Sequence, residues 1–252
     1  MKVGIVIPMY NEAAGARTNL ETILTYTRRL PGDVFVLVVN DASTDTTEPL
    51  VKKLIAEQPD DHLRLISHAR NSGYGAANRT GAQYALEQGC DYALFMDSDL
   101  TNHPKYLADF YPPMQRGVDY IKASRYVPGG GMEGVPVFRQ LISRAGNAAA
   151  ARLFGLPLHD CTNGFRAVHA RVLKSLRLKE NKFALIVEEL YQAKFSAASY
   201  AEVPTLLTAR RAGEKPSSFT YPPSVFWTYF KYAFKAFWHV RPYPNFPPGE
   251  KP

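Results

Sequence analysis

Cysteine is scarce in this 252-residue chain, which holds only Cys90 and Cys161. Two cysteines cannot build a disulfide framework or a four-cysteine zinc site, so we expect two reduced, buried thiols. Long apolar runs are missing as well, since Val34–Val39 has six residues and roughly 20 are needed to cross a bilayer. We therefore expect no transmembrane helix. The N-terminus shows no signal-peptide core, which favours a cytosolic protein.

Two kinds of glycine-rich phosphate loop are also absent. No Gly-x-Gly-x-x-Gly follows the first strand-like segment, and no Gly-Lys-Ser/Thr occurs. These absences argue against a dinucleotide-binding fold and a P-loop nucleotidase. Histidine is rare too, with six residues, and we interpret His103 and His159 as structural.

The composition is that of a globular protein, with 46% hydrophobic and 21% charged residues. The formal net charge of +7 is unevenly distributed. Thr205–Pro252 carries seven Lys or Arg against two Glu, and it holds 12 of the 31 aromatic residues. Because the basic character is confined to this aromatic segment, we expect no nucleic-acid partner.

Apolar segments bounded by turn residues alternate with segments of helical periodicity. We predict strands at Val3–Ile7, Val34–Asn40, Leu63–Ser67, Tyr92–Met96 and Tyr120–Ala123, with helices near Gly15–Arg29, Thr46–Gln58, Gly75–Gln88 and Pro104–Gln115. The less regular second half holds helices near Val137–Phe154 and Ile186–Phe195 and a strand at Tyr200–Pro204. Strands that are apolar throughout are typical of burial on both faces. The predicted fold class is α/β, a mostly parallel sheet sandwiched by helices.

Polar clusters follow three of the predicted strands, at the sheet edge where ligands bind in such folds. They are Tyr10–Glu12, Asn40–Ser43 and Asp97–Asp99. Asp97 and Asp99 flank one serine, and such a pair of carboxylates suits a divalent cation bound to a diphosphate. The alternative interpretation is a turn that caps the helix at Pro104. Carboxylates from three strand ends favour a nucleotide site.

Together these segments resemble the inverting glycosyltransferases of family 2, which have the Rossmann-like GT-A fold. The resemblance is carried by Pro8–Glu12, Asn40–Asp45, Asn71–Gly75 and Asp97–Asp99. The second half is similar to a narrower group, the dolichol- or polyprenol-phosphate mannosyltransferases, in Ser124–Gly130, Arg139–Ser143, Asp160–Arg166, Glu202–Pro204 and Arg211–Glu214. The resemblance implies a metal-dependent hexosyltransferase that moves mannose from GDP-mannose onto a polyprenyl (dolichyl) phosphate.

The resemblance also implies roles for individual residues. Asp97 and Asp99 would act in catalysis by holding Mg²⁺ or Mn²⁺ and the donor. The nucleotide sugar would contact Asp97 together with Pro8, Tyr10, Glu12, Asp41, Arg211 and Lys215. Arg125 and Arg139 would act in catalysis by binding the acceptor phosphate, and Ser143 would also contact this phosphate.

This chain departs from the family pattern at three places. Asn40 stands where the family usually has Asp, and Thr101 replaces a Gln that helps to hold the metal. A loop that normally reads Gly-x-Ser-Lys appears as Gly213–Ser218, so Lys215 is only a substitute for the displaced lysine.

A phosphate acceptor needs no strong general base, because its second pKa is about 6 and it is largely dianionic at neutral pH. Its direct attack on the anomeric carbon would invert the configuration of the sugar. The remaining difficulty is repulsion between two phosphate-bearing substrates, which a divalent ion and bidentate arginines offset. The alternative interpretation of Arg125 and Arg139 is a pair of surface salt bridges.

Three other functions stay open at this point. A sugar-1-phosphate nucleotidyltransferase has a related sheet, but Pro8–Glu12 stands where its glycine-rich loop belongs. A polyprenol-phosphate glucosyltransferase would use UDP-glucose as its donor. A catalytically inactive lipid-binding adaptor on the same fold is disfavoured, since the chain retains Asp97, Asp99, Arg125, Arg139 and Arg211.

The last predicted element is an amphipathic helix at 222–241, between a GT-A domain at 1–221 and a Pro-rich tail at 242–252. One stripe holds Phe226, Trp227, Phe230, Ala233, Phe234, Phe237 and Trp238, and the opposite face holds Thr228, Lys231, Lys235 and His239. Aromatic residues backed by lysines suit a helix at a membrane interface. We therefore expect a peripheral protein on the cytoplasmic face of a membrane. The alternatives are packing on the sheet and a dimer interface.

Overall fold

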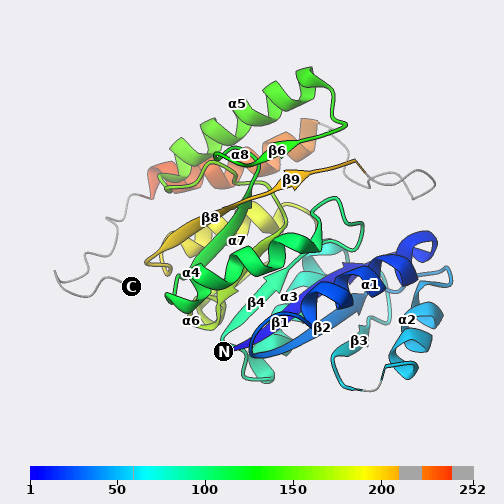
Figure 1. Ribbon diagram of the computed structural model, residues 1–252. Coiled ribbons are helices and arrows are strands. Elements are labelled where there is room, and N and C mark those ends of the chain that lie inside the picture. The colour runs from blue at the N-terminus through cyan, green and yellow to red at the C-terminus, as the bar shows by residue number, and fades with distance from the viewer. Residues whose placement is uncertain (59, 210–222, 240–252) are drawn as a thin grey trace.

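The computed structural model describes residues 1–58, 60–209 and 223–239. Its centre is a seven-stranded sheet in the order β3-β2-β1-β4-β7-β5-β8 (Figure 1). The strands are β1 (Lys2–Met9), β2 (Asp33–Asn40), β3 (Leu63–Ser67), β4 (Tyr92–Phe95), β5 (Tyr120–Ser124), β7 (Arg166–His169) and β8 (Tyr200–Pro204). β7 runs antiparallel to β4 and β5, and the other pairings are parallel. The predicted α/β fold with a mostly parallel sheet is confirmed.

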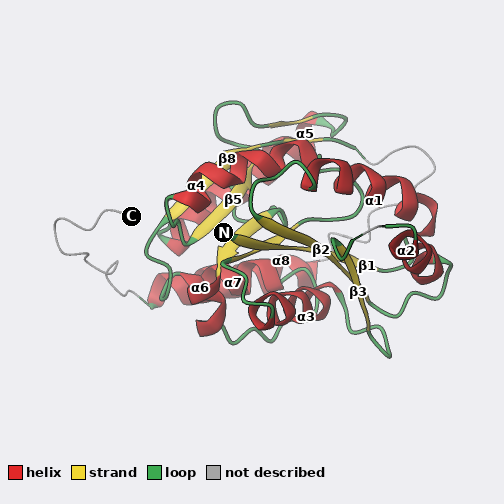
Figure 2. Ribbon diagram, turned by 60° about the horizontal axis from the view of Figure 1, so that its bottom comes forward, coloured by secondary structure: helices red, strands yellow, loops and turns green. Residues whose placement is uncertain are grey.

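Helices cover both faces of this sheet (Figure 2). One face carries α1 (Ala13–Thr27), the 3₁₀ helix η1 (Pro104–Phe110) and α4 (Tyr111–Gln115), with α2 (Thr47–Ala56) packed beside α1. The other face carries α3 (Tyr74–Glu87), α5 (Val137–Phe154), α6 (Ala170–Ser175), α7 (Leu185–Ala193) and α8 (Pro223–Trp238).

The alternation of side chains along the strands explains why two helical layers are needed. In β1, Ile5 and Ile7 are fully buried in one hydrophobic cluster, while Val6 between them is buried in the other. In β2, Val36 and Phe35 divide in the same way. Because successive side chains point to opposite faces, a continuously apolar strand must be covered on both sides.

Several elements differ from the sequence-based prediction, among them the short helix α6, which was not predicted. β7 is an additional antiparallel strand, and the two-residue strands β6 (Gly131–Met132) and β9 (Leu206–Leu207) form a separate small sheet. The helix predicted at Pro104–Gln115 is divided into η1 and α4. Pro112 and Pro113 lie at the start of α4, where the missing backbone N–H groups are tolerated, but they cannot donate the bonds that would continue a helix from η1.

The helix predicted near the C-terminus is present as α8, which packs against α5 and α7. It buries Tyr232, Ala233 and Ala236 in the cluster shared with α3, α6 and α7. The exposed fractions of Trp227, Phe234, Phe237 and Trp238 are 73%, 49%, 53% and 78%. Ala233 of the predicted apolar stripe therefore faces the protein, whereas Trp227, Phe234, Phe237 and Trp238 of the same stripe are exposed.

Some predicted features lie outside what the structure describes. They include the tail at 242–252, the segments Arg211–Glu214 and Gly213–Ser218, and the side chains of Phe226 and Thr228. Among the described helices, none combines the length and the hydropathy that crossing a bilayer requires. Cys90 and Cys161 are both buried.

Candidate active site

Three loops meet at the edge of the sheet where β1, β2 and β4 end, because these strands are parallel neighbours. Among the described residues other than glycine, positive φ angles occur at Asn11 (54°), Ala42 (56°) and Leu100 (57°), one in each loop. Left-handed backbone is unfavourable for residues with a Cβ, and such strain concentrates at functional sites. The residues with left-handed backbone therefore lie at the same edge of the sheet as the predicted polar clusters.

The loops after β1 and β2 are joined by hydrogen bonds. Thr44 N donates to Asn11 Oδ1 (2.7 Å), and Glu12 N donates to Thr47 Oγ1 (2.9 Å). Asp45 accepts bonds from Ala13 N (3.1 Å) and Thr47 N (2.9 Å), so one carboxylate holds the first turns of both α1 and α2. This network fixes the backbone around the partly buried Glu12 and Pro8 and the exposed Tyr10.

The hydrogen bonds of Asn40 explain why an amide can stand at this position, where the family usually has Asp. It is fully buried at the end of β2, and its Nδ2 donates to Glu48 Oε2 (2.8 Å) and Ser67 Oγ (3.2 Å). Its Oδ1 accepts from Ser43 N at 3.1 Å. An ionised aspartate at position 40 could not donate a hydrogen bond to Glu48. The amide of Asn40 can donate it, so Asn40 and Glu48 are chemically complementary.

Asp41 organises the entrance to α3. Its carboxylate accepts from Ser72 N (2.9 Å) and Gly73 N (2.7 Å) and lies 2.7 Å from His68 Nδ1. His68 Nε2 lies 2.8 Å from Thr80 Oγ1. Asp41 is only 3% exposed, so the structure brings it to the predicted edge and assigns it a supporting role for the loop after β3.

Asp97 and Asp99 follow β4 at the same edge. Asp99 Oδ1 accepts from Thr101 N (3.1 Å) and Thr101 Oγ1 (2.8 Å). Asp97 is half-buried, and burial together with the charge of Asp97 raises the pKa of the nearby Tyr74. Thr208 N donates to Thr101 O (3.0 Å), which ties this loop to the end of β9. Thr101, where the family has Gln, thus orients a carboxylate.

The donor set fits a divalent cation that is shared with a diphosphate. Within residues 1–58, 60–209 and 223–239, no three His, Cys, Asp or Glu side chains are grouped so that they could hold a metal ion. Mg²⁺ commonly takes one or two protein carboxylates and completes its shell with water and substrate phosphates. Asp97 and Asp99 match that pattern.

Arg125 follows β5 and lies in a buried ion pair. Its Nε and one terminal nitrogen bind the two oxygens of Asp160 at 2.7 and 2.9 Å, and the same terminal nitrogen donates to Thr162 Oγ1 at 2.9 Å. Burial raises the pKa of Asp160, but the charge and hydrogen bonds of Arg125 outweigh burial, and the pKa is lowered. With the Arg125 side chain 11% exposed and that of Asp160 at 0%, this is not the surface salt bridge considered from the sequence.

Helix α5 carries the other predicted acceptor residues on one face. Arg139, Ser143 and Asn147 are spaced by four residues, which places them one turn apart. Ser143 Oγ lies 2.6 Å from the Tyr126 hydroxyl, and Asn147 Oδ1 accepts from Cys161 N at 2.8 Å. Arg139 is exposed, and none of the residues that the structure describes pairs with its guanidinium group.

The structure thus brings Glu12, Asp41, Asp97 and Asp99 to one edge, and it links Ser143 to the residue after Arg125. Arg211 and Lys215 lie outside the described residues. Sequence reasoning missed the supporting side chains His68, Asn147, Asp160 and Glu202. Asp160 and Glu202 had a signal, because they lie in Asp160–Arg166 and Glu202–Pro204, two of the segments that carry the resemblance.

The two histidines interpreted as structural have structural contacts. His103 Nδ1 accepts from Lys105 N (3.1 Å) and caps η1. His159 Nδ1 lies 2.7 Å from Glu202 Oε2, and Glu202 also accepts from Asp160 N (3.0 Å). Glu202 therefore holds the loop that carries the partner of Arg125.

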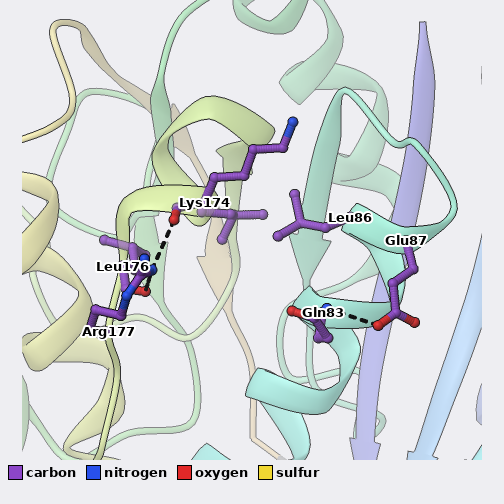
Figure 3. A pocket seen from close by; sticks show the side chains of 7 residues that line it. Gln83, Leu86, Glu87, Lys174, Leu176 and Arg177 are labelled. Atoms are coloured by element: carbon purple, nitrogen blue, oxygen red, sulfur yellow. Dashed lines mark hydrogen bonds between the residues drawn. The ribbon is translucent and has the colours of Figure 1, made fainter.

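A shallow pocket between α3 and α6 lies away from this site (Figure 3). It is lined by Gln83, Leu86, Glu87, Leu173, Lys174, Leu176 and Arg177. Two hydrogen bonds join residues of its lining, since Gln83 donates to Glu87 (2.8 Å) and Arg177 donates to Lys174 O (3.0 Å). Because α3 begins at the polar edge, its last turn lies at the opposite edge of the sheet.

Solved structures support the fold. The crystal structure of glucosyl-3-phosphoglycerate synthase from Mycobacterium tuberculosis in complex with Mn²⁺, UDP and glucosyl-3-phosphoglycerate matches with a TM-score of 0.63 at 18% identity, covering 95% of this chain and 81% of that chain. The same synthase with Mg²⁺ and UDP matches with a TM-score of 0.62 at 20% identity, over 95% and 80% of the two chains. At these identities the likeness shows the GT-A-like fold alone.

Sequence relatives are more specific. The chain is 31% identical over 212 residues to the polyprenol monophosphomannose synthase of Mycolicibacterium smegmatis, covering 83% of this chain and 78% of the relative. It is 33% identical over 221 residues to the undecaprenyl-phosphate mannosyltransferase of Micrococcus luteus, covering 86% and 88%. The dolichol-phosphate mannosyltransferase of Pyrococcus furiosus is 31% identical over 220 residues, and the match spans 85% of this chain but 58% of that protein.

Residues 4–177 match the family model described as Glycosyl transferase family 2. This match covers the loops after β1, β2 and β4 as well as Arg125, Arg139 and Asp160. With the fold, the carboxylate edge and the relatives in agreement, the chain belongs to glycosyl transferase family 2.

Proposed function

We propose that this protein transfers a mannosyl group from GDP-mannose to the phosphate of a polyprenyl lipid such as dolichyl phosphate, with inversion at the anomeric carbon. The strand order is the observation that carries the proposal. β4 and β5 both pair with β7 and are parallel to each other, with Phe95, Arg166 and Lys122 in register across the three strands. Asp97 and Arg125 therefore emerge from the same edge two strands apart, about 10 Å at ordinary strand spacing.

This separation suits two phosphate-bearing substrates that meet at one sugar. The carboxylates after β4 serve the donor diphosphate, and the cationic groups after β5 and on α5 serve the acceptor phosphate. The three relatives at 31–33% identity are named polyprenol monophosphomannose synthase, undecaprenyl-phosphate mannosyltransferase and dolichol-phosphate mannosyltransferase, which supports a mannosyl donor and a lipid phosphate acceptor.

Each residue has a defined task in this mechanism. Asp97 and Asp99 would hold Mg²⁺ or Mn²⁺, which when bound supplies positive charge against the leaving diphosphate. Pro8, Tyr10, Glu12 and Asp41 line or support the nucleotide side, and Arg211 and Lys215 are donor contacts in this proposal. Arg139 and Ser143 bind the acceptor phosphate, while Asp160 holds Arg125 in a fixed orientation beside them.

The attacking atom belongs to the acceptor. A phosphate dianion is already nucleophilic at neutral pH, so no side chain has to remove a proton. The task of the protein is to orient the two substrates and to offset their charge repulsion. This agrees with the structural contacts of His103 and His159.

The proposal includes a peripheral membrane location. Val137, Phe138, Leu141 and Ile142 on α5 are 71%, 72%, 61% and 48% exposed, and α5 packs against α8 with its exposed aromatic residues. Arg139 lies in the same turn of α5 as these apolar side chains. Apolar residues interspersed with cations are typical of helices that lie in the membrane interface, where the acceptor phosphate is found. Two buried free thiols agree with the reducing cytoplasmic face.

The test is a panel of donors and acceptors. The full-length protein is given GDP-mannose, UDP-glucose or UDP-N-acetylglucosamine with a short polyprenyl phosphate and Mg²⁺ or Mn²⁺, and the lipid product is identified by mass spectrometry. A glycerol phosphate acceptor serves as the water-soluble control. We expect a mannosylated lipid from GDP-mannose alone. A product only from UDP-glucose would make the protein a glucosyltransferase, and no product from any donor would favour the inactive adaptor.

A further inference from the structure

Asn163 lies three residues before β7 and is only 5% exposed. Its backbone N donates to Asp160 Oδ1 (3.1 Å), and its carbonyl oxygen accepts from Lys122 Nζ (2.6 Å). In the side chain, Oδ1 accepts from Phe165 N (3.0 Å) and Nδ2 donates to Asn102 Oδ1 (3.3 Å). Because a backbone N–H can only donate, the bond from Phe165 fixes which end of the amide faces Asn102.

The side-chain amide at position 163 reaches the loop after β4 through Asn102. Asn102 is 4% exposed, and it follows Thr101, whose backbone N and hydroxyl both donate to Asp99 Oδ1. Gly164 lies beside the other end of the same loop, since a Cβ at this position would be 3.6 Å from Asp97 Oδ2. The amide and the glycine therefore approach the loop near both carboxylates that the proposed function assigns to the donor.

The backbone of Asn163 reaches the buried pair of Arg125 and Asp160. The carboxylate of Asp160 accepts from Asn163 N, and its two oxygens bind the guanidinium group of Arg125 at 2.7 and 2.9 Å. Lys122, which binds the carbonyl group of Asn163, is fully buried on β5, and Arg125 directly follows this strand. Hydrogen bonds and short stretches of backbone thus run from Arg125 through Asn163 to Asp99.

We propose that Asn163 is a positioning residue, which fixes the placement of the donor loop relative to the acceptor loop through its bonds to Asn102 and Asp160. The inference rests on the proposed function, to which it adds a residue that aligns the two substrates. Reacting atoms have to be held about 3–3.5 Å apart, and a misplacement of about 1 Å can cost about 100-fold in rate. Loss of the alignment therefore slows transfer, while each substrate still binds to its own loop.

The test is Asn163→Ala, which removes the bond to Asn102 and keeps the backbone bonds to Asp160 and Lys122. It also removes the bond from Phe165 N, so Asn102→Ala, which spares that bond, is the second variant. The rate of a single turnover is measured with the nucleotide sugar that the donor panel identifies, Mn²⁺ and a short polyprenyl phosphate, all saturating. Calorimetry measures the affinities for the nucleoside diphosphate with Mn²⁺ and for the acceptor. We expect both variants to be slower by about 10-fold or more, with both affinities unchanged.

A second readout measures the alignment without turnover. Mn²⁺ bound with the nucleoside diphosphate is paramagnetic, so it accelerates the ³¹P relaxation of an acceptor phosphate nearby, and this acceleration falls steeply with distance. We expect a smaller acceleration in Asn163→Ala than in wild type. Ser199→Ala is the matched control, because it removes a hydrogen bond from Asp119 N (3.0 Å) at the other end of β5. It should show the wild-type rate and relaxation.

The double variant separates positioning from general damage. In Asn102→Ala with Asn163→Ala, the rate should equal that of the slower single variant, because all three variants lack the same bond. Wild-type rates in both single variants, additive losses, unchanged ³¹P relaxation, or a loss of affinity that accounts for the whole fall in rate would each overturn the inference. A wild type that transfers no sugar from any donor would contradict the proposed function itself, whereas an active wild type with equally active variants overturns only the role of Asn163.

Discussion

At the residue scale, Arg125 and Arg139 differ in how their guanidinium groups are held. Arg125 makes a bidentate pair with Asp160, which is fully buried, while Arg139 is exposed on the first turns of α5. Removing Arg125 would leave a buried carboxylate without its cation, so the effect of that change on activity is mixed with a loss of stability. Arg139 is the residue whose function can be tested without that complication.

We predict that Arg139→Ala raises the KM for the polyprenyl phosphate and leaves nucleotide binding unchanged. The guanidinium group has no partner within the described part of the chain that would lose a contact. Steady-state kinetics with varied acceptor and titration with nucleotide alone measure the two effects. Arg144→Ala, an exposed arginine on a different face of α5, is the matched control. Equal weakening of acceptor and nucleotide binding in Arg139→Ala would refute the assignment.

Lys122 provides a prediction about pH. It is fully buried, donates to Asn163 O at 2.6 Å, and has its pKa lowered to about 8 by burial and by the nearby Arg166. In the unfolded chain its pKa is about 10.4. Between these values the unfolded state binds more protons than the folded state, so this lysine makes the free energy of unfolding rise with pH over that range.

The matched variant is Lys122→Met, which removes the titrating group and keeps an unbranched side chain. Relative to this variant, the wild type should gain stability between pH about 7.5 and about 9.5. Urea unfolding followed by circular dichroism at the two pH values measures the change. A stability difference that is the same at both pH values would show that Lys122 does not titrate as its burial implies.

The sequence predicted the carboxylates of the site, because Asp97 and Asp99 directly follow an apolar strand. It did not predict what orients them. Asp41 is held by the backbone N–H groups of Ser72 and Gly73, 31 and 32 positions later, and Asp160 reaches Arg125 across 35 positions of sequence. Such contacts depend on how distant loops pack, and no local periodicity reports them. Thr101 is the exception, since a hydroxyl two residues after a carboxylate commonly bonds to it.

At the scale of elements, β7 lies between β4 and β5, and a buried ion pair links it to α7. Arg166 binds both oxygens of Glu189, and Tyr120 donates to the same carboxylate at 2.6 Å. Burial raises the pKa of Glu189, but Arg166 and Tyr120 outweigh burial and lower it. The strand β7 could not be predicted from the sequence, because it has four residues and begins with the charged Arg166, a pattern that does not indicate a central strand. Its partner lies 23 positions later.

Glu189→Ala should lower the free energy of unfolding by about 3–5 kcal/mol, because it leaves the Arg166 charge buried and unpaired. Glu57→Gln, in the exposed pair with Arg17, is the control and should have no measurable effect. Chemical denaturation of both variants against wild type measures the difference. A Glu189→Ala protein as stable as Glu57→Gln would mean that the buried pair does not hold β7 to α7.

The exposed aromatic residues of α8 carry the membrane proposal. Trp227→Ser, Phe237→Ser and Trp238→Ser combined should reduce sedimentation with anionic liposomes by 10-fold or more, since each aromatic residue that leaves the interface removes roughly 1.5–3 kcal/mol of burial. The fold should persist, because these side chains are 53–78% exposed.

Tyr232→Phe is the control on the same helix, because its ring is buried and its hydroxyl bonds Glu180 at 2.9 Å. It should leave liposome binding unchanged. Substitutions are preferable to truncation after Tyr221, which would also remove Ala233 and Ala236 from the core. Undiminished liposome binding by the triple variant, or no binding by the wild type, would contradict a role of α8 at the membrane.

At the scale of the whole molecule, the order of the strands determines which polar loops lie together at one edge of the sheet. Parallel strands whose ends share one edge were predictable from their apolar sequences, and so was the clustering of Asp41, Asp97 and Asp99 there. The insertion of β7 between β4 and β5 was not predictable, and it sets the spacing between the two halves of the site. The packing of α8 on α5 and α7 was equally hard to predict, because two of the residues it buries, Ala233 and Ala236, are small.

The measurement that tests the central claim most directly is transfer of labelled mannose from GDP-mannose into solvent-extractable polyprenyl phosphate, with Mn²⁺ and with EDTA, by wild type and Asp99→Ala. Asp99 lies in the polar loop after β4 and outside both hydrophobic clusters, so the variant should stay folded, and its circular dichroism serves as the control. The account predicts labelled lipid from wild type with Mn²⁺ and none with EDTA or from Asp99→Ala. Wild-type turnover and intact metal dependence in Asp99→Ala would contradict it.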